Sequence, residues 1–308
     1  MQTRRDNPET AAQEFENITN ANDGGLFYDL AFAPAPLSLP KLTSLDDRPR
    51  VAILREQGVN GHVEMAWAFA AAGFAAVDVH MSDVIRGVVT LDDFKGVAAC
   101  GGFSYGDVLG AGSGWAKSIM LNARARDEFD RFLNSRSDTF ALGVCNGCQM
   151  LSSLRSLVPQ MGDWPDFKPN MSGRFEARVC MVEVDSPSTT PSVFLRGMHG
   201  SRFPIAVAHG EGRVDWPASA TARASSCVRY IDPSTREPTQ RYPYNPNGSV
   251  EGATGFQALD GRVFALMPHP ERVVTLSSNS WHPSDVRDSW QGRGPWMRMF
   301  ENARLWIG

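Results

Sequence analysis

The stretch TFALGVCNGCQML, residues 139–151, contains the most informative pattern in the chain. Its apolar first half, Phe140–Val144, has the length and composition of a buried strand, and a helical pattern begins near Gln149. Cys145 lies in the tight connection between them, flanked by small residues. Such a turn exposes the side chain at its tip, and the positive end of the following helix favours a thiolate there. We therefore predict that Cys145 is a nucleophile.

Other interpretations of this stretch stay open, because Cys145 and Cys148 have the CxxC spacing of redox dithiols and of zinc sites. A structural zinc site usually needs a second pair of ligands at short spacing, whereas Cys100, Cys180 and Cys227 stand singly. We therefore expect no metal site. A redox dithiol and a merely buried thiol remain alternatives to the nucleophile.

A cysteine nucleophile needs a base, and His269 has a special setting in VFALMPHPE, residues 263–271. The prolines on both sides block continuation of the strand, so the histidine is displayed from a rigid strand end. In extended chain, residues i and i+2 point the same way, which lets the Glu271 carboxylate orient the ring. The pattern predicts a Cys-His-Glu triad. A proline-bounded turn carrying a surface histidine is the alternative.

A glycine-rich segment, CGGFSYGDVLGAGSGWA at residues 100–116, follows another apolar strand. Backbone of this composition can approach a ligand closely. The tetrahedral intermediate of acyl transfer needs two N–H donors, and one near Gly102 or Phe103 would complement the N–H of Asn146. A phosphate loop is disfavoured, because neither GxxxxGK[ST] nor GxGxxG occurs here. A loop without function remains the alternative.

Together these segments resemble the class I glutamine amidotransferases, in which a Cys-His-Glu triad releases ammonia from glutamine. The sequence is most similar to the glutaminase domains of the phosphoribosylformylglycinamidine synthase family, in their large single-chain form. The similarity covers about residues 48–308. It rests on REQGVNGHVEMA (55–66), GGFSYGDVLGAGSGWAKS (101–118), GVCNGCQ (143–149), HGEGR (209–213), NSWHP (279–283) and PWMRMFENARLW (295–306).

The resemblance implies site residues at the positions that match the family pattern. The nucleophile is Cys145, the acid and base is His269, and Glu271 orients the histidine. The oxyanion donors are the backbone N–H groups of Gly102 and Asn146. The resemblance further implies that the substrate is gripped by Gln149, Ser172 and Phe175.

The resemblance assigns no role in catalysis or substrate binding to two further residues. Arg174, beside the substrate-binding positions, could instead pair with a carboxylate elsewhere. His209 belongs to the family pattern, and we expect it to be a packed histidine at a strand end.

The same resemblance implies a partner. Ammonia would pass inside the assembly to a synthetase domain of the same enzyme, where formylglycinamide ribonucleotide is activated with ATP and aminated. ATP and Mg²⁺ belong to that synthetase, and no cofactor is expected in this chain. Two alternatives remain: a cysteine hydrolase of similar fold, peptidase-like or deglycase-like, and an interaction module that is silent until it docks.

Composition sets broad limits on function. With 308 residues and 42% hydrophobic residues, the chain can bury a full core. A formal net charge of -4 offers no electrostatic case for binding nucleic acid or a membrane surface. No apolar run approaches the ~20 residues of a membrane span, and the N-terminus lacks the apolar core of a secretory signal. The odd count of five cysteines suits a reducing compartment, so we expect a cytoplasmic protein.

The pattern from residue 50 onward predicts an α/β fold. Apolar strands alternate with helices, which indicates a mostly parallel sheet flanked by helices, and the resemblance implies the flavodoxin-like fold of class I glutamine amidotransferases. After Phe175 strands dominate, which predicts an added antiparallel or mixed portion. The expected strands are 51–54, 75–80, 97–100 and 140–144, and the expected helices are 62–72, 116–132 and 148–157.

The first 47 residues read differently from the rest. They are polar and rich in asparagine up to Asp23, and an apolar patch, Leu26–Phe32, and three prolines follow. We expect residues 1–47 to be a linker or arm whose apolar patch either covers this domain's own surface or packs between domains, and residues 48–308 to form the glutaminase domain.

Overall fold

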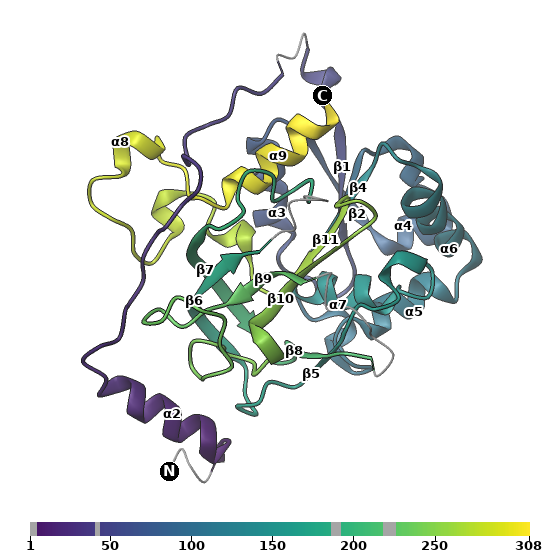
Figure 1. Cartoon of the computed structure of the whole chain (residues 1–308). Helices are drawn as coiled ribbons and strands as arrows, with labels where there is room; N and C mark the ends of the chain where they lie inside the picture. Colours follow the sequence, from purple (N-terminus) through teal and green to yellow (C-terminus); the bar gives the residue numbers. More distant parts are fainter. Residues whose placement is uncertain (1–4, 41–43, 186–191, 218–225) are drawn as a thin grey trace.

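A single mixed sheet organises the chain, whose computed structural model describes residues 5–40, 44–185, 192–217 and 226–308 (Figure 1). Within those residues the sheet has nine strands in the order β2-β1-β3-β4-β11-β10-β9-β6-β7. Its first half is parallel throughout. The strands of this half are β1 (Arg50–Arg55), β2 (Ala75–His80), β3 (Gly96–Ala99), β4 (Phe140–Val144) and β11 (Val263–Leu266).

The second half of the sheet is antiparallel. Its chain is rich in strands and lacks long helical patterns, and the described parts of the connections between neighbouring strands contain no helical crossover. These strands are β10 (Ala253–Ala258), β9 (Ser226–Tyr230), β6 (Glu176–Val184) and β7 (Arg202–His209). A separate two-stranded ribbon joins β5 (Asp166–Lys168) to β8 (Arg213–Asp215).

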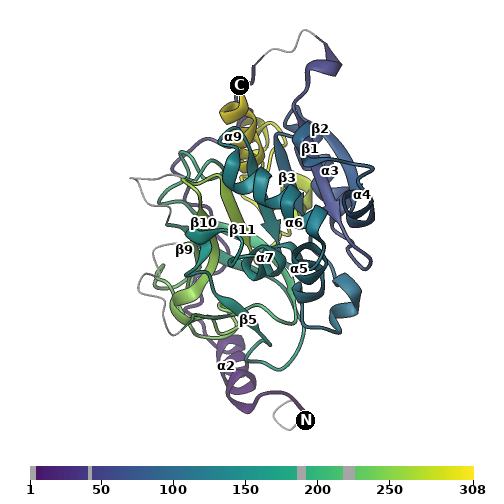
Figure 2. The same ribbon diagram turned by 90° about the vertical axis from the view of Figure 1, so that its right-hand side faces the viewer.

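Helices cover both faces of the parallel half (Figures 1 and 2). One face carries α3 (His62–Ala71) and the C-terminal α9 (Met297–Ile307). The other carries α4 (Met81–Arg86), α5 (Ser113–Met120), α6 (Ala123–Asp130) and α7 (Asn146–Ser153). Outside these layers lie α2 (Pro8–Ile18) and α8 (Arg287–Trp290). Short 3₁₀ segments are η1 (Leu45–Asp47), η2 (Leu91–Asp93), η3 (Ser104–Asp107), η5 (Pro159–Met161), η7 (Val250–Gly252), η8 (Pro270–Arg272) and η9 (Leu276–Ser278), and a π turn spans Arg131–Ser135.

The core is built on aromatic side chains that meet the buried parallel strands. Phe140 of β4 is 1% exposed, and its ring centroid lies 5.9 Å from Phe69, 5.7 Å from Phe74 and 5.4 Å from Phe194. Because both faces of these strands are covered, all five residues of β4 are buried. This rigid layer supports the strand ends that carry the site.

The predicted fold class is confirmed: a mostly parallel sheet flanked by helices continues into an antiparallel portion. The predicted strands agree with β1 to β4 to within one residue at each end. The helix expected over 116–132 is wrong as a single element. It is divided into α5 and α6, because Asn122 takes an extended conformation and its side chain caps Ala125 N at 2.9 Å.

Other helix boundaries also differ from the sequence-based expectation. α7 begins at Asn146, two residues before the expected start, and ends at Ser153. Neither α2 nor α4 was expected from the sequence. α4 has only six residues, and its ends are set by His80 as N-cap and by Gly87 in the left-handed conformation.

The N-terminal arm packs along the domain over much of its length. It leaves α2 and runs up one side of the molecule towards the C-terminus (Figure 1). In the apolar patch, Tyr28 lies edge-on to Trp290 at 5.1 Å, and Asp29 exchanges backbone hydrogen bonds of 2.8 and 2.7 Å with Arg202 on edge strand β7. The patch therefore covers the domain's own surface. Residues 1–4 and 41–43 of the arm lie outside the described part of the chain, and the division at residues 47 and 48 stays a prediction.

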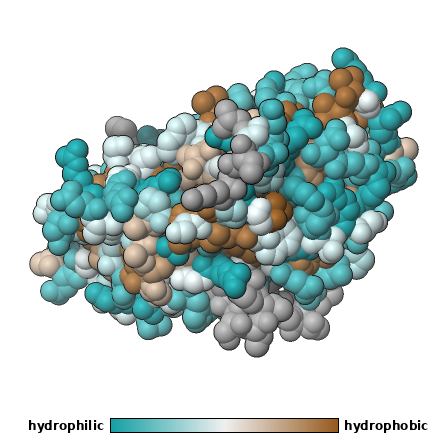
Figure 3. Space-filling view, turned by 90° about the horizontal axis from the view of Figure 1, so that it is seen from above, coloured by the Kyte–Doolittle hydropathy of each residue, from teal (hydrophilic) through white to brown (hydrophobic). Residues whose placement is uncertain are grey.

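No helix among the described residues is long and apolar enough to span a bilayer. The face of the molecule seen in Figure 3 is mainly hydrophilic, with apolar side chains gathered in patches.

Candidate active site

Three segments with unusual chemistry emerge from neighbouring strands of the parallel half. β4 lies between β3 and β11, and all three run in the same direction. Gly101 follows β3, Cys145 follows β4 directly, and His269 lies three residues beyond β11. Parallel strands end at the same edge of a sheet, which is where open α/β sheets place their sites. The topology thus brings together the three segments singled out from the sequence.

Cys145 lies on a sharp strand-to-helix turn. Its backbone has φ 53° and ψ -107°, a conformation that costs a residue with a side chain about 1–2 kcal/mol. The turn is fixed from the β11 side, where Leu266 O accepts a 2.9 Å hydrogen bond from Cys145 N. It also requires Gly147, since a Cβ at that position would lie 2.0 Å from Ala99 O. The side chain is 6% exposed.

His269 and Glu271 are hydrogen bonded through His269 Nδ1 and Glu271 Oε1 at 2.6 Å. The expected contact is present, but the expected extended backbone is not, because Pro270–Arg272 forms a 3₁₀ turn. The histidine backbone is held by Ala206 O, which accepts from His269 N at 2.8 Å. His269 Nε2 is buried and has no hydrogen-bond partner among the described residues. The carboxylate thus fixes the ring through one nitrogen and leaves the other available for proton transfer.

The electrostatic surroundings of His269 favour its charged form. Burial alone would lower the pKa of the imidazole, but the negative charges of Glu271 and Cys145 outweigh it and raise the pKa to about 10. An imidazolium beside a sulfur favours a thiolate, the form that attacks carbon. The same pair can then return the proton to a leaving group.

The two backbone groups expected to bind an oxyanion flank this pair. The N–H of Asn146 is the first in α7 and therefore has no intrahelical acceptor. In the glycine-rich loop, Phe103 N donates to Gly58 O at 2.9 Å, so Phe103 is not available as a donor. Gly102 has φ +151° and lies so close to Val59 that a Cβ would be 2.5 Å from its Cα. Gly102 is thus the donor that this geometry favours.

Side chains that the sequence analysis missed hold the glycine-rich loop against the nucleophile. Tyr105 and Asp107 both have positive φ, 54° and 56°. The Tyr105 hydroxyl donates to Glu56 Oε2 at 2.8 Å, and Asn146 Nδ2 donates to Asp107 Oδ1 at 3.1 Å. Asn146 Oδ1 in turn accepts from Ser104 N at 3.2 Å. Asn146 thus braces the loop with its side chain, while its backbone N–H, at the start of α7, has no acceptor within the helix.

Gly101 is the position where a single methyl group should disturb the site most directly. A Cβ there would lie 2.6 Å from His269 Cε1 and 3.3 Å from Cys145 Cβ. The prolines around the histidine limit its retreat, so Gly101→Ala should lower the rate of the reaction at this site about 100-fold by misplacing the ring. Initial rates with the substrate proposed below will measure this. Gly162→Ala, at a glycine with ordinary φ, should keep its activity, and equal rates in wild type and Gly101→Ala would contradict the prediction.

The CxxC alternatives fit the structure less well. Cys148 is fully buried in α7, and burial raises the pKa of its thiol well above the usual range, with a further contribution from Cys145. Cys145 and Cys148 are both free thiols in the structure. Within the described residues, no three His, Cys, Asp or Glu side chains are grouped closely enough to hold a metal ion.

The segment Ala208–Glu211 connects the nucleophile to the predicted substrate-binding residues. Cys145 Sγ lies 3.6 Å from Ala208 O, and Gln149 Nε2 donates to Glu211 O at 2.5 Å. Phe175 lies beside this segment and pairs with Phe103 of the glycine-rich loop, with centroids 6.0 Å apart. Gln149 and Phe175 therefore both lie beside one segment that also touches the nucleophile.

Ser172 and His209 occupy buried positions near this segment. Ser172 is 1% exposed, and its hydroxyl has no partner among the described residues. His209 ends β7 and is buried, as expected for a packed strand-end histidine. Burial, with a smaller contribution from His269, lowers the pKa of His209 to about 3, so this ring is neutral at physiological pH.

Ser172, Arg174 and Phe175 belong to one loop, residues 170–175. Asn170, which organises this loop, was not singled out from the sequence. Its Nδ2 donates to His209 O at 2.7 Å and to Arg174 O at 3.0 Å. Its Oδ1 accepts from Gly212 N at 3.0 Å. One buried amide thus ties both ends of the 170–175 loop to the segment beside the nucleophile. An asparagine that opens a polar loop is a weak signal, and only its contacts reveal this role.

Comparison with known proteins agrees with this geometry. The profile of the CobB/CobQ-like glutamine amidotransferase domain matches residues 48–307. The chain belongs to this family. A solved structure of PurLQS from Thermotoga maritima has the same fold, with a TM-score of 0.60 and 24% identity, and the match covers 83% of this chain and 97% of that one.

Two curated relatives of the amidotransferase chain are much longer than it is. The phosphoribosylformylglycinamidine synthase of Saccharomyces cerevisiae is 52% identical over 317 residues, and that of Schizosaccharomyces pombe is 51% identical over 313. Each match covers 100% of this chain but only 23% and 24% of those enzymes, respectively. The chain therefore spans about a quarter of the length of the relatives that it resembles.

Proposed function

We propose that this chain is the glutaminase region of a phosphoribosylformylglycinamidine synthase. The observation that carries the proposal is the convergence of Cys145, His269 and Glu271 at the ends of two neighbouring strands, with a 2.6 Å bond between the last two. The identity of 52% and 51% to two such synthases over the whole chain supports the assignment to this enzyme.

The first half of the reaction forms a thioester. The Cys145 thiolate attacks the side-chain amide carbon of glutamine, and the electron pair of the C=O bond moves to oxygen. The N–H groups of Gly102 and Asn146 stabilise that oxyanion. As the carbon–nitrogen bond breaks, His269 gives its proton to the departing nitrogen, which leaves as ammonia.

The second half returns the enzyme to its starting state. The now neutral His269 takes a proton from water, and the hydroxide attacks the thioester carbon. The carbon–sulfur bond breaks, glutamate leaves, and the Cys145 thiolate is restored beside the imidazolium. Throughout both steps Glu271 keeps the ring oriented and stabilises its charge. Gln149, Ser172 and Phe175 hold the substrate in place.

The ammonia goes to the synthetase domain of the same enzyme, our proposed partner. There ATP and Mg²⁺ support the conversion of formylglycinamide ribonucleotide to formylglycinamidine ribonucleotide in purine biosynthesis. We place the reaction in the cytoplasm, and the five cysteines support this, because all of them are free thiols.

The direct test is covalent labelling with a glutamine analogue that carries a reactive ketone. Mass spectrometry of the isolated chain should find the label on Cys145, and excess glutamine should prevent it. If the folded chain stays unlabelled, the experiment is repeated with the synthetase region of its own full-length enzyme added. Labelling that appears only then supports a site completed by the partner. A folded assembly that remains unlabelled, or is labelled elsewhere, rejects the proposal.

A further inference from the structure

The arm helix α2 rests on the loop that we propose to bind glutamine. Asn7 caps α2, accepting from Glu9 N at 3.0 Å and from Thr10 N at 3.1 Å through its side chain. The backbone N–H of the same residue donates to Ser172 O at 3.3 Å. The start of α2 is therefore bonded to a residue of the 170–175 loop. Residues 7 and 8–18 lie outside the stretch matched by the amidotransferase family.

Arg174 links the loop to α2 by charge. Its guanidinium group lies 3.3 Å from Asp6 Oδ2 and 2.9 Å from Glu14 Oε2, both in the arm. It also lies 3.3 Å from Glu176 Oε1, at the start of β6. Three carboxylates thus surround one loop arginine. Pairing with a carboxylate was the alternative considered for Arg174, and the structure shows that two of its three acidic partners come from the arm.

A second arginine, on strand β6, also pairs with α2. Arg178 of β6 lies 3.4 Å from Glu14 Oε1 and 2.7 Å from Glu176 Oε2. Tyr242 hydrogen bonds to both arginines. The side chain of Glu176 is 1% exposed, whereas that of Glu14 is 24% exposed. The network therefore has a buried centre that belongs to the domain and an outer contact, Glu14, that belongs to the arm.

The inner side of the same loop reaches the site. Asn170 Nδ2 donates to His209 O at 2.7 Å, and the ring of Phe175 meets Phe103 of the glycine-rich loop. Between these two residues lie Ser172 and Arg174, each of which also contacts the arm. The 170–175 loop thus contacts the arm as well as His209 and Phe103, which lie near the nucleophile.

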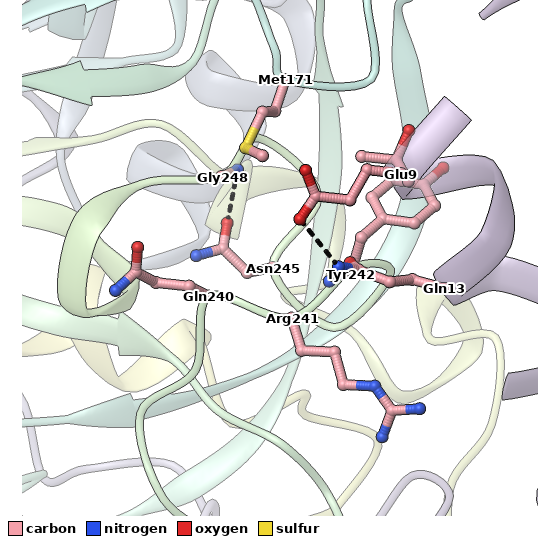
Figure 4. Close-up of a pocket in the computed structure, with 9 residues that line it drawn as sticks. Glu9, Gln13, Met171, Gln240, Arg241, Tyr242, Asn245 and Gly248 are labelled. Carbon is pink, nitrogen blue, oxygen red and sulfur yellow. Dashed lines mark hydrogen bonds between the residues drawn. The ribbon is translucent and has the colours of Figure 1, made fainter. Parts of the chain in front are cut away.

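The junction between arm and domain is polar and incompletely filled. A cavity of about 280 Å³ lies between Glu9 and Gln13 of α2, Met171 of the loop, and the chain at residues 240–248 (Figure 4). A densely packed apolar contact would fix α2 by itself, but here its position depends on directed polar bonds. Loss of one such bond should shift the loop without unfolding the domain.

We propose that α2 positions the glutamine-binding loop, with Glu14 and Arg174 as positioning residues, so that the arm completes the substrate site. This inference rests on the proposed glutaminase function. It assigns a role in glutamine affinity to residues outside the matched amidotransferase domain. The arm would not take part in bond making, since none of the contacts of its described residues, 5–40 and 44–47, is with the Cys145, His269 and Glu271 group.

The test compares Glu14→Gln with Glu16→Gln in the full chain, with the synthetase region present. Glu14 pairs with both arginines, whereas Glu16, on the same helix, is 69% exposed and lies 3.9 Å from Arg241. Glu14→Gln should raise the KM for glutamine by about fivefold or more with kcat nearly unchanged, the size expected for coupling between sites. Glu16→Gln should match wild type in both constants.

Two further measurements distinguish failure of the positioning role from failure of the proposed function. The double variant Asp6→Asn/Glu14→Gln removes both arm charges from Arg174 and should raise the KM further. Thermal unfolding of each variant checks that the fold is kept, because a purely structural arm would change the unfolding temperature and leave the KM alone. A wild-type protein that does not hydrolyse glutamine would refute the proposed function. Normal wild-type turnover with an unchanged KM in both Glu14 variants would refute only the positioning role.

Discussion

Replacing Cys145 by alanine is expected to reduce glutamine hydrolysis to background, a loss on the order of 10⁶-fold, as for removal of the nucleophile from a protease triad. The chain has no second sulfur positioned to take over, because Cys148 points into the core and is fully buried. Alanine keeps the Cβ, so the strained backbone of the turn is retained and the fold should persist. Glutamate release, measured with the synthetase region present, and covalent labelling by the ketone analogue both report the loss.

Cys148→Ala is the matched control for this prediction. It changes the other cysteine of the same CxxC by the same substitution, in the helix that Cys145 precedes. We expect it to retain most of the glutaminase rate, with some loss of stability from the small cavity. A redox dithiol would instead need both sulfurs. Equal loss of activity in the two variants, with both folded, would therefore favour the redox interpretation over the nucleophile.

The strands of the parallel half of the sheet could be predicted from local sequence patterns alone. A run such as Phe140–Val144 is apolar on every position because it is buried on both faces, and this signal does not depend on distant sequence. Helix boundaries were harder to predict. The break between α5 and α6 depends on one side-chain cap at Asn122, which competes with an otherwise continuous helical pattern.

The site could be assembled in outline from sequence because its chemistry is concentrated in short segments. The sequence does not show which strands pair with each other. β11 pairs with β4 although more than 100 residues separate them, and this pairing places His269 beside Cys145. The contacts of Asn170 and of Glu56 with Tyr105 were missed for the same reason. Each joins segments whose proximity arises only from the folded topology.

The arm shows how a composition-based expectation can be incomplete. Its first residues are polar and suggested a linker, yet Pro8–Ile18 forms a helix. Propensity alone is weak for an 11-residue helix, and isolated helices of this length are marginal in water. The helix is stabilised by Asn7 at its start and by charge pairs with Arg174 and Arg178 of the domain. Contacts of this kind with the domain cannot be seen in the arm's own sequence.

Replacing Glu271 by glutamine is expected to lower kcat/KM for glutamine about 10⁴-fold, the effect seen when the orienting carboxylate of a triad is made neutral. Glutamine has nearly the same shape, so the change removes charge more than volume. A neutral amide can also donate to Nδ1 and select the wrong tautomer of His269. The 2.6 Å bond between Nδ1 and the carboxylate makes both consequences direct. Steady-state glutamate release measures the loss.

The charge also sets the titration of His269, which separates its catalytic role from a structural one. Glu271 raises the pKa of His269, so Glu271→Gln should lower that pKa by about 1–3 pH units from its value of about 10, as measured by NMR titration of the ring. Glu301→Gln is the control, because Glu301 is also buried, with 1% of its surface exposed against 2% for Glu271, but belongs to α9. It should leave both the titration and the rate unchanged. An unshifted His269 titration in Glu271→Gln would show that the carboxylate does not stabilise the imidazolium, and the proposed role of Glu271 would then fail even if activity were lost.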